Sequence, residues 1–122
     1  MWILDAALKV WLYRRATDMR KSYNGLIALV KQQLRDDPLN GSLYVFVNRR
    51  RTQLKILYFE GDGYCPWCKR LERGEFRVRF DGDDKARVEL STLMLLIDGI
   101  DVESPDRFKR YKHRPLEPHH VQ

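Results

Sequence analysis

The segment from Leu54 to Phe59 constrains the fold most strongly, because both faces of this short run carry apolar side chains. A strand with one solvated face would alternate apolar and polar residues, whereas a strand covered on both sides does not have to. We therefore expect a buried central strand here. Gly61 and Gly63 follow it and predict a sharp change of direction, since glycine adopts backbone conformations that other residues avoid.

The residues after this turn predict a short basic helix that ends at Gly74, a suitable C-terminal cap. Its apolar residues recur at helical spacing and its basic residues fall on the opposite face. The apolar set is Tyr64, Trp67, Cys68 and Leu71, and the basic set is Lys69, Arg70 and Arg73.

Apolar residues spaced three and four apart predict one long helix from Asp18 to Arg35, with Thr17 as its N-cap. Short strands are expected at 9–14, 43–47, 54–59, 76–80 and 85–90, and a last helix is expected after Ser91, ending at Asp98. Hairpins should join 43–47 to 54–59 and 76–80 to 85–90. The predicted fold class is α+β, a small antiparallel sheet of four or five strands with one long helix packed on a face and two shorter helices.

The length of 122 residues suits one α+β domain, expected at 1–102, followed by a polar, basic tail at 103–122. Within the tail, residues 107–114 (RFKRYKHR) combine five Lys or Arg with two aromatics, a composition suited to phosphate neutralisation and base stacking. No apolar run reaches the roughly 20 residues of a membrane span, and residues 1–5 do not resemble a signal peptide. We expect a cytoplasmic protein.

The net charge of +6 favours a polyanionic partner, with nucleic acid first and acidic protein second, although such a charge can also serve solubility alone. Three consecutive arginines at the tip of the first hairpin are either simply solvated or a phosphate contact. Basic residues on the hairpin, the central strand, the expected helix and the following strand could converge. The candidate DNA-binding residues are Arg49, Arg50, Arg51, Lys55, Lys69, Arg70, Arg73, Arg77 and Arg79.

Two motifs could carry chemistry, and both are weak. Cys65 and Cys68 form a CxxC motif that could exchange disulfides if it opened a helix, whereas packing cysteines are the plainer interpretation. Glu60 and Asp62 could hold Mg²⁺ for phosphodiester cleavage, but carboxylates there more often cap or pair with arginine. All three histidines lie in the expected tail, so neither a histidine-based catalyst nor a zinc site is expected, and we expect no cofactor.

Four segments together resemble a known family: residues 17–30 (TDMRKSYNGLIALV), 41–63 (GSLYVFVNRRRTQLKILYFEGDG), 68–76 (CKRLERGEF) and 96–101 (LIDGID). They are similar to the Orf2-like accessory proteins, also called TnpB, of bacterial insertion sequence 66 transposons. The resemblance spans most of residues 10–102, and residues after Asp106 lie outside it. Relatives carry an apolar or aromatic residue where Cys68 stands.

The resemblance implies a process: such a protein is encoded beside a separate transposase with an acidic catalytic triad and assists transposition. It carries no catalytic residues across to this chain. We therefore expect a non-enzymatic accessory factor for transposition that contacts DNA through the basic residues and assists the transposase. The alternatives are a protein-interaction subunit that docks on the transposase without touching DNA, and a Mg²⁺-dependent nuclease.

Overall fold

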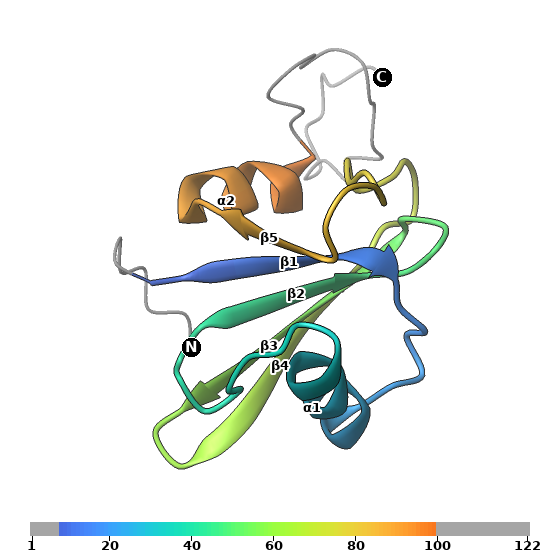
Figure 1. The fold of residues 1–122 in the computed structure, drawn as a ribbon. Coiled ribbons are helices and arrows are strands. Elements are labelled where there is room, and N and C mark those ends of the chain that lie inside the picture. Colours follow the sequence, from blue (N-terminus) through green and yellow to red (C-terminus); the bar gives the residue numbers. More distant parts are fainter. Residues whose placement is uncertain (1–7, 100–122) are drawn as a thin grey trace, which may run out of the picture.

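In the computed structural model, which describes residues 8–99, a five-stranded sheet lies between two helices (Figure 1). The sheet order is β4-β3-β2-β1-β5, so β2 is central and β4 and β5 are the edges. Along the chain the elements are β1 (Val10–Ala16), α1 (Tyr23–Gln32), β2 (Leu43–Val47), β3 (Gln53–Glu60), β4 (Gly63–Arg70), β5 (Lys85–Val88) and α2 (Leu90–Asp98).

The sheet is mixed. β1 and β2 run parallel, because α1 carries the chain back across the sheet between them, and all other neighbouring strands are antiparallel. The α+β class and a small sheet of four or five strands are confirmed, although one of the five segments predicted as strands is not among those observed. The prediction of a wholly antiparallel sheet was wrong. The predictions of one long helix and of a third helix were also wrong, since residues 8–99 contain two short helices.

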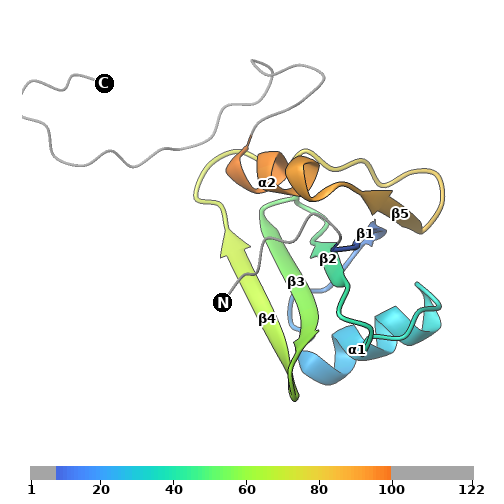
Figure 2. The ribbon, with the colours of Figure 1, turned by 90° about the vertical axis from the view of Figure 1, so that its left-hand side faces the viewer.

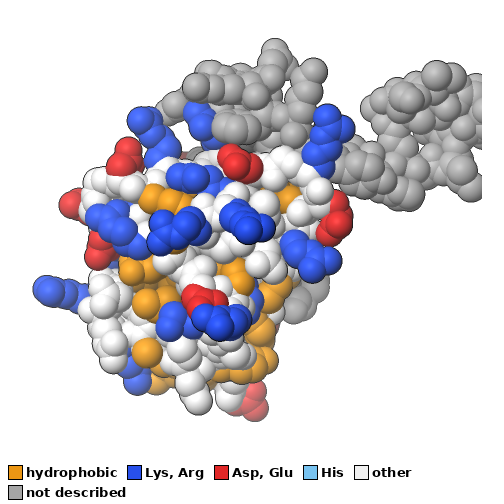
Figure 3. All heavy atoms as spheres, turned by 90° about the vertical axis from the view of Figure 1, so that its right-hand side faces the viewer, with side chains coloured by type: hydrophobic (Ala, Val, Ile, Leu, Met, Phe, Trp, Pro, Cys, Tyr) orange, Lys and Arg blue, Asp and Glu red, His pale blue; other side chains and the backbone are white. Residues whose placement is uncertain are grey.

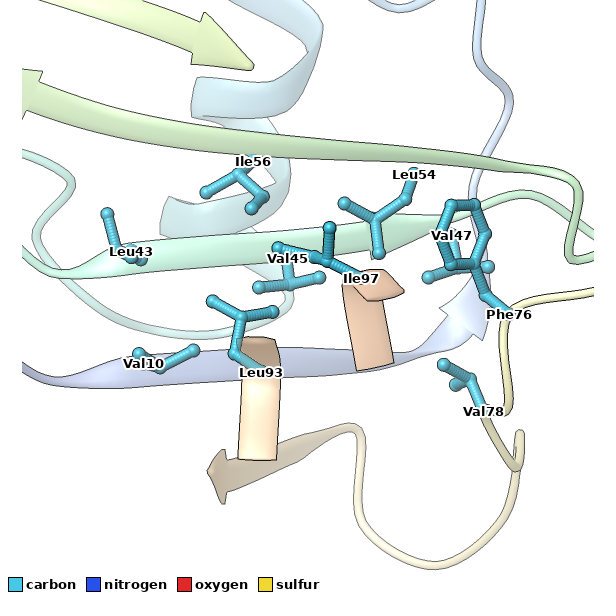
Figure 4. Packing of buried hydrophobic residues seen from close by; sticks show 10 residues of the cluster. All are labelled: Val10, Leu43, Val45, Val47, Leu54, Ile56, Phe76, Val78, Leu93 and Ile97. Carbon is cyan, nitrogen blue, oxygen red and sulfur yellow. The ribbon is translucent and has the colours of Figure 1, made fainter. Parts of the chain in front are cut away.

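Two hydrophobic clusters occupy the two faces of the sheet, and each helix covers one of them (Figure 2). All five residues of β2 are buried, and successive side chains point to opposite faces. Val45 and Val47 pack with Leu93 and Ile97 of α2 (Figure 4), whereas Tyr44 and Phe46 pack with Leu26 and Val30 of α1. As predicted, a central strand buried on both faces organises the fold. This strand is β2, whereas the strand predicted for this position, β3, lies beside it.

The segment predicted as a basic helix is strand β4. Gly61 adopts a φ of 66° in a two-residue turn, with Glu60 paired to Gly63, and the chain returns along β3. Glycine at the first central position is typical of the type II′ turn that joins antiparallel strands. Tyr64 and Trp67 therefore lie on opposite faces of a strand and not on one face of a helix.

Both predicted ends of the long helix were also wrong. α1 begins at Tyr23, five residues later than expected, because the Asp18 carboxylate accepts a hydrogen bond from the backbone N–H of Arg20 and holds a turn. Thr17 is not a cap, since its backbone N–H donates to Val47 O at 2.9 Å and Ser22 takes the N-cap position. The helix ends before Arg35, whose φ of 53° lies in the left-handed region.

Residues 76–80 form no strand, so the second expected hairpin was wrong: β5 pairs with β1. The predicted alternation is nevertheless retained, with Phe76 and Val78 buried against the sheet. The last helix is confirmed as α2, although it begins at Leu90 with Glu89, and not Ser91, at the N-cap. It ends at Asp98, and Gly99 is the C-cap with a φ of 86°. The predicted domain boundary at 102 and the tail lie outside the described residues. No helix within residues 8–99 is long and apolar enough to cross a membrane.

Candidate nucleic-acid interface

The β2–β3 turn presents the arginine triplet. Asn48 organises this turn, because its side-chain oxygen accepts hydrogen bonds from the backbone N–H groups of Thr52 and Gln53 at 2.9 and 3.0 Å. The Asn48 carbonyl also accepts from the Arg51 N–H at 3.0 Å, which closes the turn around Arg49 and Arg50. These two arginines are exposed, and no ion pair to them is found within residues 8–99.

Arg51 has a different role from its two neighbours. Its φ of 60° is unusual for a residue with a side chain, and that side chain is half-buried. The guanidinium donates from Nε to Val78 O at 2.6 Å and lies 4.4 Å from the ring centroid of Phe80. The Arg51 carbonyl accepts from Phe76 N–H at 2.7 Å. Arg51 therefore fastens residues 76–80 to the turn.

This fastening brings basic residues from several segments to one end of the sheet. Gln53, which opens β3, pairs with Arg70, which closes β4, so Arg70 and Arg73 leave the sheet beside the turn. Viewed from this end, Lys and Arg side chains gather over the surface with fewer acidic side chains among them (Figure 3). We use the name basic end for the exposed or half-buried arginines of the turn and of residues 70–79, without Arg51, whose guanidinium is engaged within the fold. Its members are Arg49, Arg50, Arg70, Arg73, Arg77 and Arg79.

Lys55 and Lys69 are not part of the basic end, because they point to opposite faces of the sheet. Lys55 Nζ donates to the carbonyl oxygens of Met19 and Lys21, both at 2.8 Å, below the start of α1. Lys69 Nζ donates to Ile97 O at 3.0 Å, at the C-terminal end of α2, where a positive charge stabilises a helix. Each lysine anchors a neighbouring segment.

Two arginines of the basic end form ion pairs with neighbouring acidic side chains. Arg70 lies 3.4 Å from Glu72 and Arg79 lies 3.5 Å from Asp81, and all four side chains are more than half exposed. Such exposed pairs contribute about 0–1 kcal/mol and separate easily. Arg77 also has interactions within the chain. In the described part of the chain, Arg49, Arg50 and Arg73 make no ion pair.

Sequence reasoning missed three further arginines near this end. Arg14 and Arg15, at the end of β1, hold residues 82–84 by hydrogen bonds to Asp83 O and Gly82 O at 2.9 and 2.8 Å. Arg15 also pairs with Asp84 at 2.9 Å. Arg20 faces the β2–β3 turn across an open depression. These arginines reach this end because β1 lies parallel beside β2, and no local sequence pattern indicates that pairing.

The depression separates residues 16–20 from the β2–β3 turn and has a volume of ≈ 970 Å³. Its charged lining residues are Asp18, Arg20, Arg49 and Arg50. Asp18 and Arg20 form a close pair, with Arg20 Nη2 2.6 Å from Asp18 Oδ2. The side-chain hydrogen bond from Arg20, followed by that from its backbone N–H, lowers the pKa of Asp18 to about 2. The pair is therefore ionised at neutral pH.

The two candidate catalytic motifs lie elsewhere. Cys65 and Cys68 belong to β4, where Cys65 pairs with Tyr58 and Cys68 with Lys55, so they point to opposite faces and open no helix. Glu60 and Asp62 lie at the β3–β4 turn, seven residues along β3 from Gln53 and so roughly 23 Å from the basic end. In the described part of the chain no group of three His, Cys, Asp or Glu could hold a metal ion.

Comparison with known proteins identifies the class to which this small α+β protein belongs. Residues 8–107 match the model of the family described as IS66 Orf2 like protein. Two relatives from Sinorhizobium fredii are the uncharacterized proteins y4hO and y4jC. The chain is 34% identical to y4hO over 98 residues, covering 80% of this chain and 85% of the relative. It is 30% identical to y4jC over 109 residues, covering 89% and 88%. No solved structure matches with significance.

The chain therefore belongs to the IS66 Orf2-like family. This confirms the resemblance found in the sequence.

Proposed function

We propose that this protein is a non-enzymatic accessory factor for transposition of an insertion sequence, and that it contacts DNA through the basic end. The family supports the process, because its description refers to an insertion sequence. The observation that carries the DNA contact is the position of Arg49, Arg50 and Arg73. These side chains are exposed at one end of the sheet and make no ion pair within residues 8–99.

The proposed contact is to phosphates and not to base edges. Arg49 and Arg50 project from a turn, whereas sequence readout in the major groove generally uses a helix or a two-stranded ribbon inserted as a unit. The ion pairs Arg70–Glu72 and Arg79–Asp81 are exposed, so both arginines can turn toward an approaching polyanion at little cost. The nine residues predicted from sequence reduce to a smaller proposed set, because Arg51, Lys55 and Lys69 hold the fold.

The separate transposase of the element is the proposed protein partner. The rival form of this proposal is an interaction subunit that docks on the transposase through the same end and never touches DNA. Glu72 and Asp81, which pair with arginines of the basic end, favour this rival, since acidic side chains weaken phosphate binding and suit a mixed-charge protein surface.

Fluorescence anisotropy with a labelled transposon-end duplex tests the DNA contact. The affinity should fall steeply between 50 and 200 mM salt, with similar values for an unrelated duplex, because phosphate contacts release counterions (about 10³-fold for some six contacts). Retention by the transposase in nuclease-treated lysate, together with no anisotropy change at micromolar protein, would instead support the rival.

A further inference from the structure

We propose that the depression between residues 16–20 and the β2–β3 turn binds a phosphate group, and that Arg20 exchanges the carboxylate of Asp18 for this phosphate. The inference rests on the proposed function and deepens it, because it names the ligand group and the residues that hold it. The depression is lined by Arg20, Arg49 and Arg50 and by one acid, Asp18.

The walls of the depression are held in place by contacts that do not use these arginines. On one side, Lys55 Nζ fixes the carbonyl oxygens of Met19 and Lys21, and Thr17 N–H binds Val47 O. On the other side, the side chain of Asn48 fixes the turn through Thr52 and Gln53. Binding energy is therefore not needed to shape the site, which is the condition for efficient recognition of a small anion.

The cationic side chains have the chemistry of a phosphate site. The guanidinium group is planar and can donate two parallel hydrogen bonds to a phosphate or a carboxylate. Arg20 already makes this kind of contact with Asp18, through Nε and Nη2 to the carboxylate oxygens at 2.6–3.1 Å. Three arginines and one aspartate leave a local excess of two positive charges for an incoming anion.

Thr17 adds an independent observation. It lines the depression and is 4% exposed, and its hydroxyl oxygen is buried without a hydrogen-bond partner in the described residues. Buried hydroxyl groups are normally hydrogen-bonded, so a rotation of the Thr17 side chain toward a bound oxygen acceptor would satisfy a group that has no partner in the free protein.

Asp18 is the group that an anion must displace, and this gives the inference a distinctive test. Asp18→Asn preserves the turn, because an amide oxygen can still accept from the Arg20 N–H, but it removes the negative charge and releases the Arg20 side chain. Phosphate affinity should therefore increase, although a residue of the site has been changed. The expected gain is roughly two- to fivefold, the equivalent of one exposed ion pair.

The experiment is a titration of the ¹⁵N-labelled full chain with inorganic phosphate at constant ionic strength, followed by NMR. Amides of residues 16–20 and 48–53 should shift saturably, Asp18→Asn should tighten binding, and Arg49→Gln/Arg50→Gln should weaken it by roughly tenfold. Lys31→Gln, an exposed change in the last turn of α1, serves as the control and should leave the affinity unchanged.

Two outcomes would overturn the inference: shifts that match those caused by chloride, or weaker binding in Asp18→Asn. The proposed DNA contact can fail separately. Saturable phosphate binding without any duplex binding would leave the site intact and remove the proposed function, whereas duplex binding that Asp18→Asn does not strengthen would do the reverse.

Discussion

Arg51 Nε donates a hydrogen bond of 2.6 Å to Val78 O, and this contact joins the β2–β3 turn to the segment that follows β4. The same guanidinium covers the ring of Phe80. An arginine that sequence reasoning assigned to DNA therefore positions its neighbours. Without it, Arg49 and Arg50 would lose their fixed relation to Arg77 and Arg79.

Arg51→Ala should destabilise the protein by about 1–3 kcal/mol, because it removes a charge-assisted hydrogen bond and a cation–π contact. Arg50→Ala, one residue earlier at an exposed position, should change the free energy of unfolding by less than about 0.5 kcal/mol. Chemical denaturation of the two variants measures both values. Equal stabilities would show that the Arg51 contacts do not hold residues 76–80.

Lys55→Met should loosen the segment before α1. The methionine side chain retains the apolar stem, but the carbonyl oxygens of Met19 and Lys21 lose their shared donor. Amide hydrogen exchange should accelerate in residues 17–23 and remain unchanged in β2. Lys69→Met is the matched variant on the other face, and it should accelerate exchange at the end of α2 instead. Identical exchange maps for both variants would contradict the assigned anchors.

The ion pair of Asp18 with Arg20 should stabilise the protein at neutral pH and stop doing so in strong acid. Arg20 lowers the pKa of Asp18 to about 2 in the folded chain, below the ordinary value of roughly 3.9. A carboxyl group whose pKa is lower in the folded than in the unfolded chain stabilises the fold at pH values above its unfolded-state pKa. This stabilisation is lost as the pH falls through the folded-state pKa of about 2. The melting temperature of the wild-type protein should therefore exceed that of Asp18→Asn at pH 6, and the difference should shrink toward pH 2. A difference that grew on acidification would contradict the ion pair.

The two cysteines should not form a disulfide with each other. They lie three residues apart on one strand, so their Cα atoms are separated by roughly 10 Å, beyond the limit of about 7 Å for a disulfide. Cys68 is exposed and Cys65 is half-buried, so iodoacetamide should label Cys68 faster. Mass spectrometry after mild oxidation checks both points, and an intramolecular 65–68 disulfide in the folded protein would refute the strand assignment.

Local patterns were sufficient for the parts of the fold that local contacts determine. The hairpin joining β2 and β3 follows from two apolar runs with a short polar link, and the end of α2 follows from Gly99. The apolar face of residues 76–80 was also correct, because burial of Phe76 and Val78 needs only a surface to pack against and no strand partner.

The errors arose where two patterns fit one segment or where distant contacts decide. Residues 64–71 satisfy a helical period, but they also follow a two-residue glycine turn after a strand, and pairing with β3 decides between them. Lys55 and Lys69 could not be assigned from sequence, because their partners are carbonyl groups 28 to 36 residues away. The depression could not be predicted, since it requires β1 to lie parallel to β2.

The most direct test of the central claim compares two charge reversals of equal size. The first variant, Arg49→Glu/Arg50→Glu, changes the basic end. The second, Lys31→Glu/Arg87→Glu, changes two residues away from it. Lys31 lies in the last turn of α1, and Arg87 of β5 pairs with Trp11 near the start of β1. Both variants alter the net charge equally, so non-specific attraction changes alike. Measured by duplex-DNA anisotropy at 100 mM salt, the first variant should lose at least roughly 30-fold in affinity and the second less than about threefold. Equal losses in the two variants would contradict a DNA contact at the basic end.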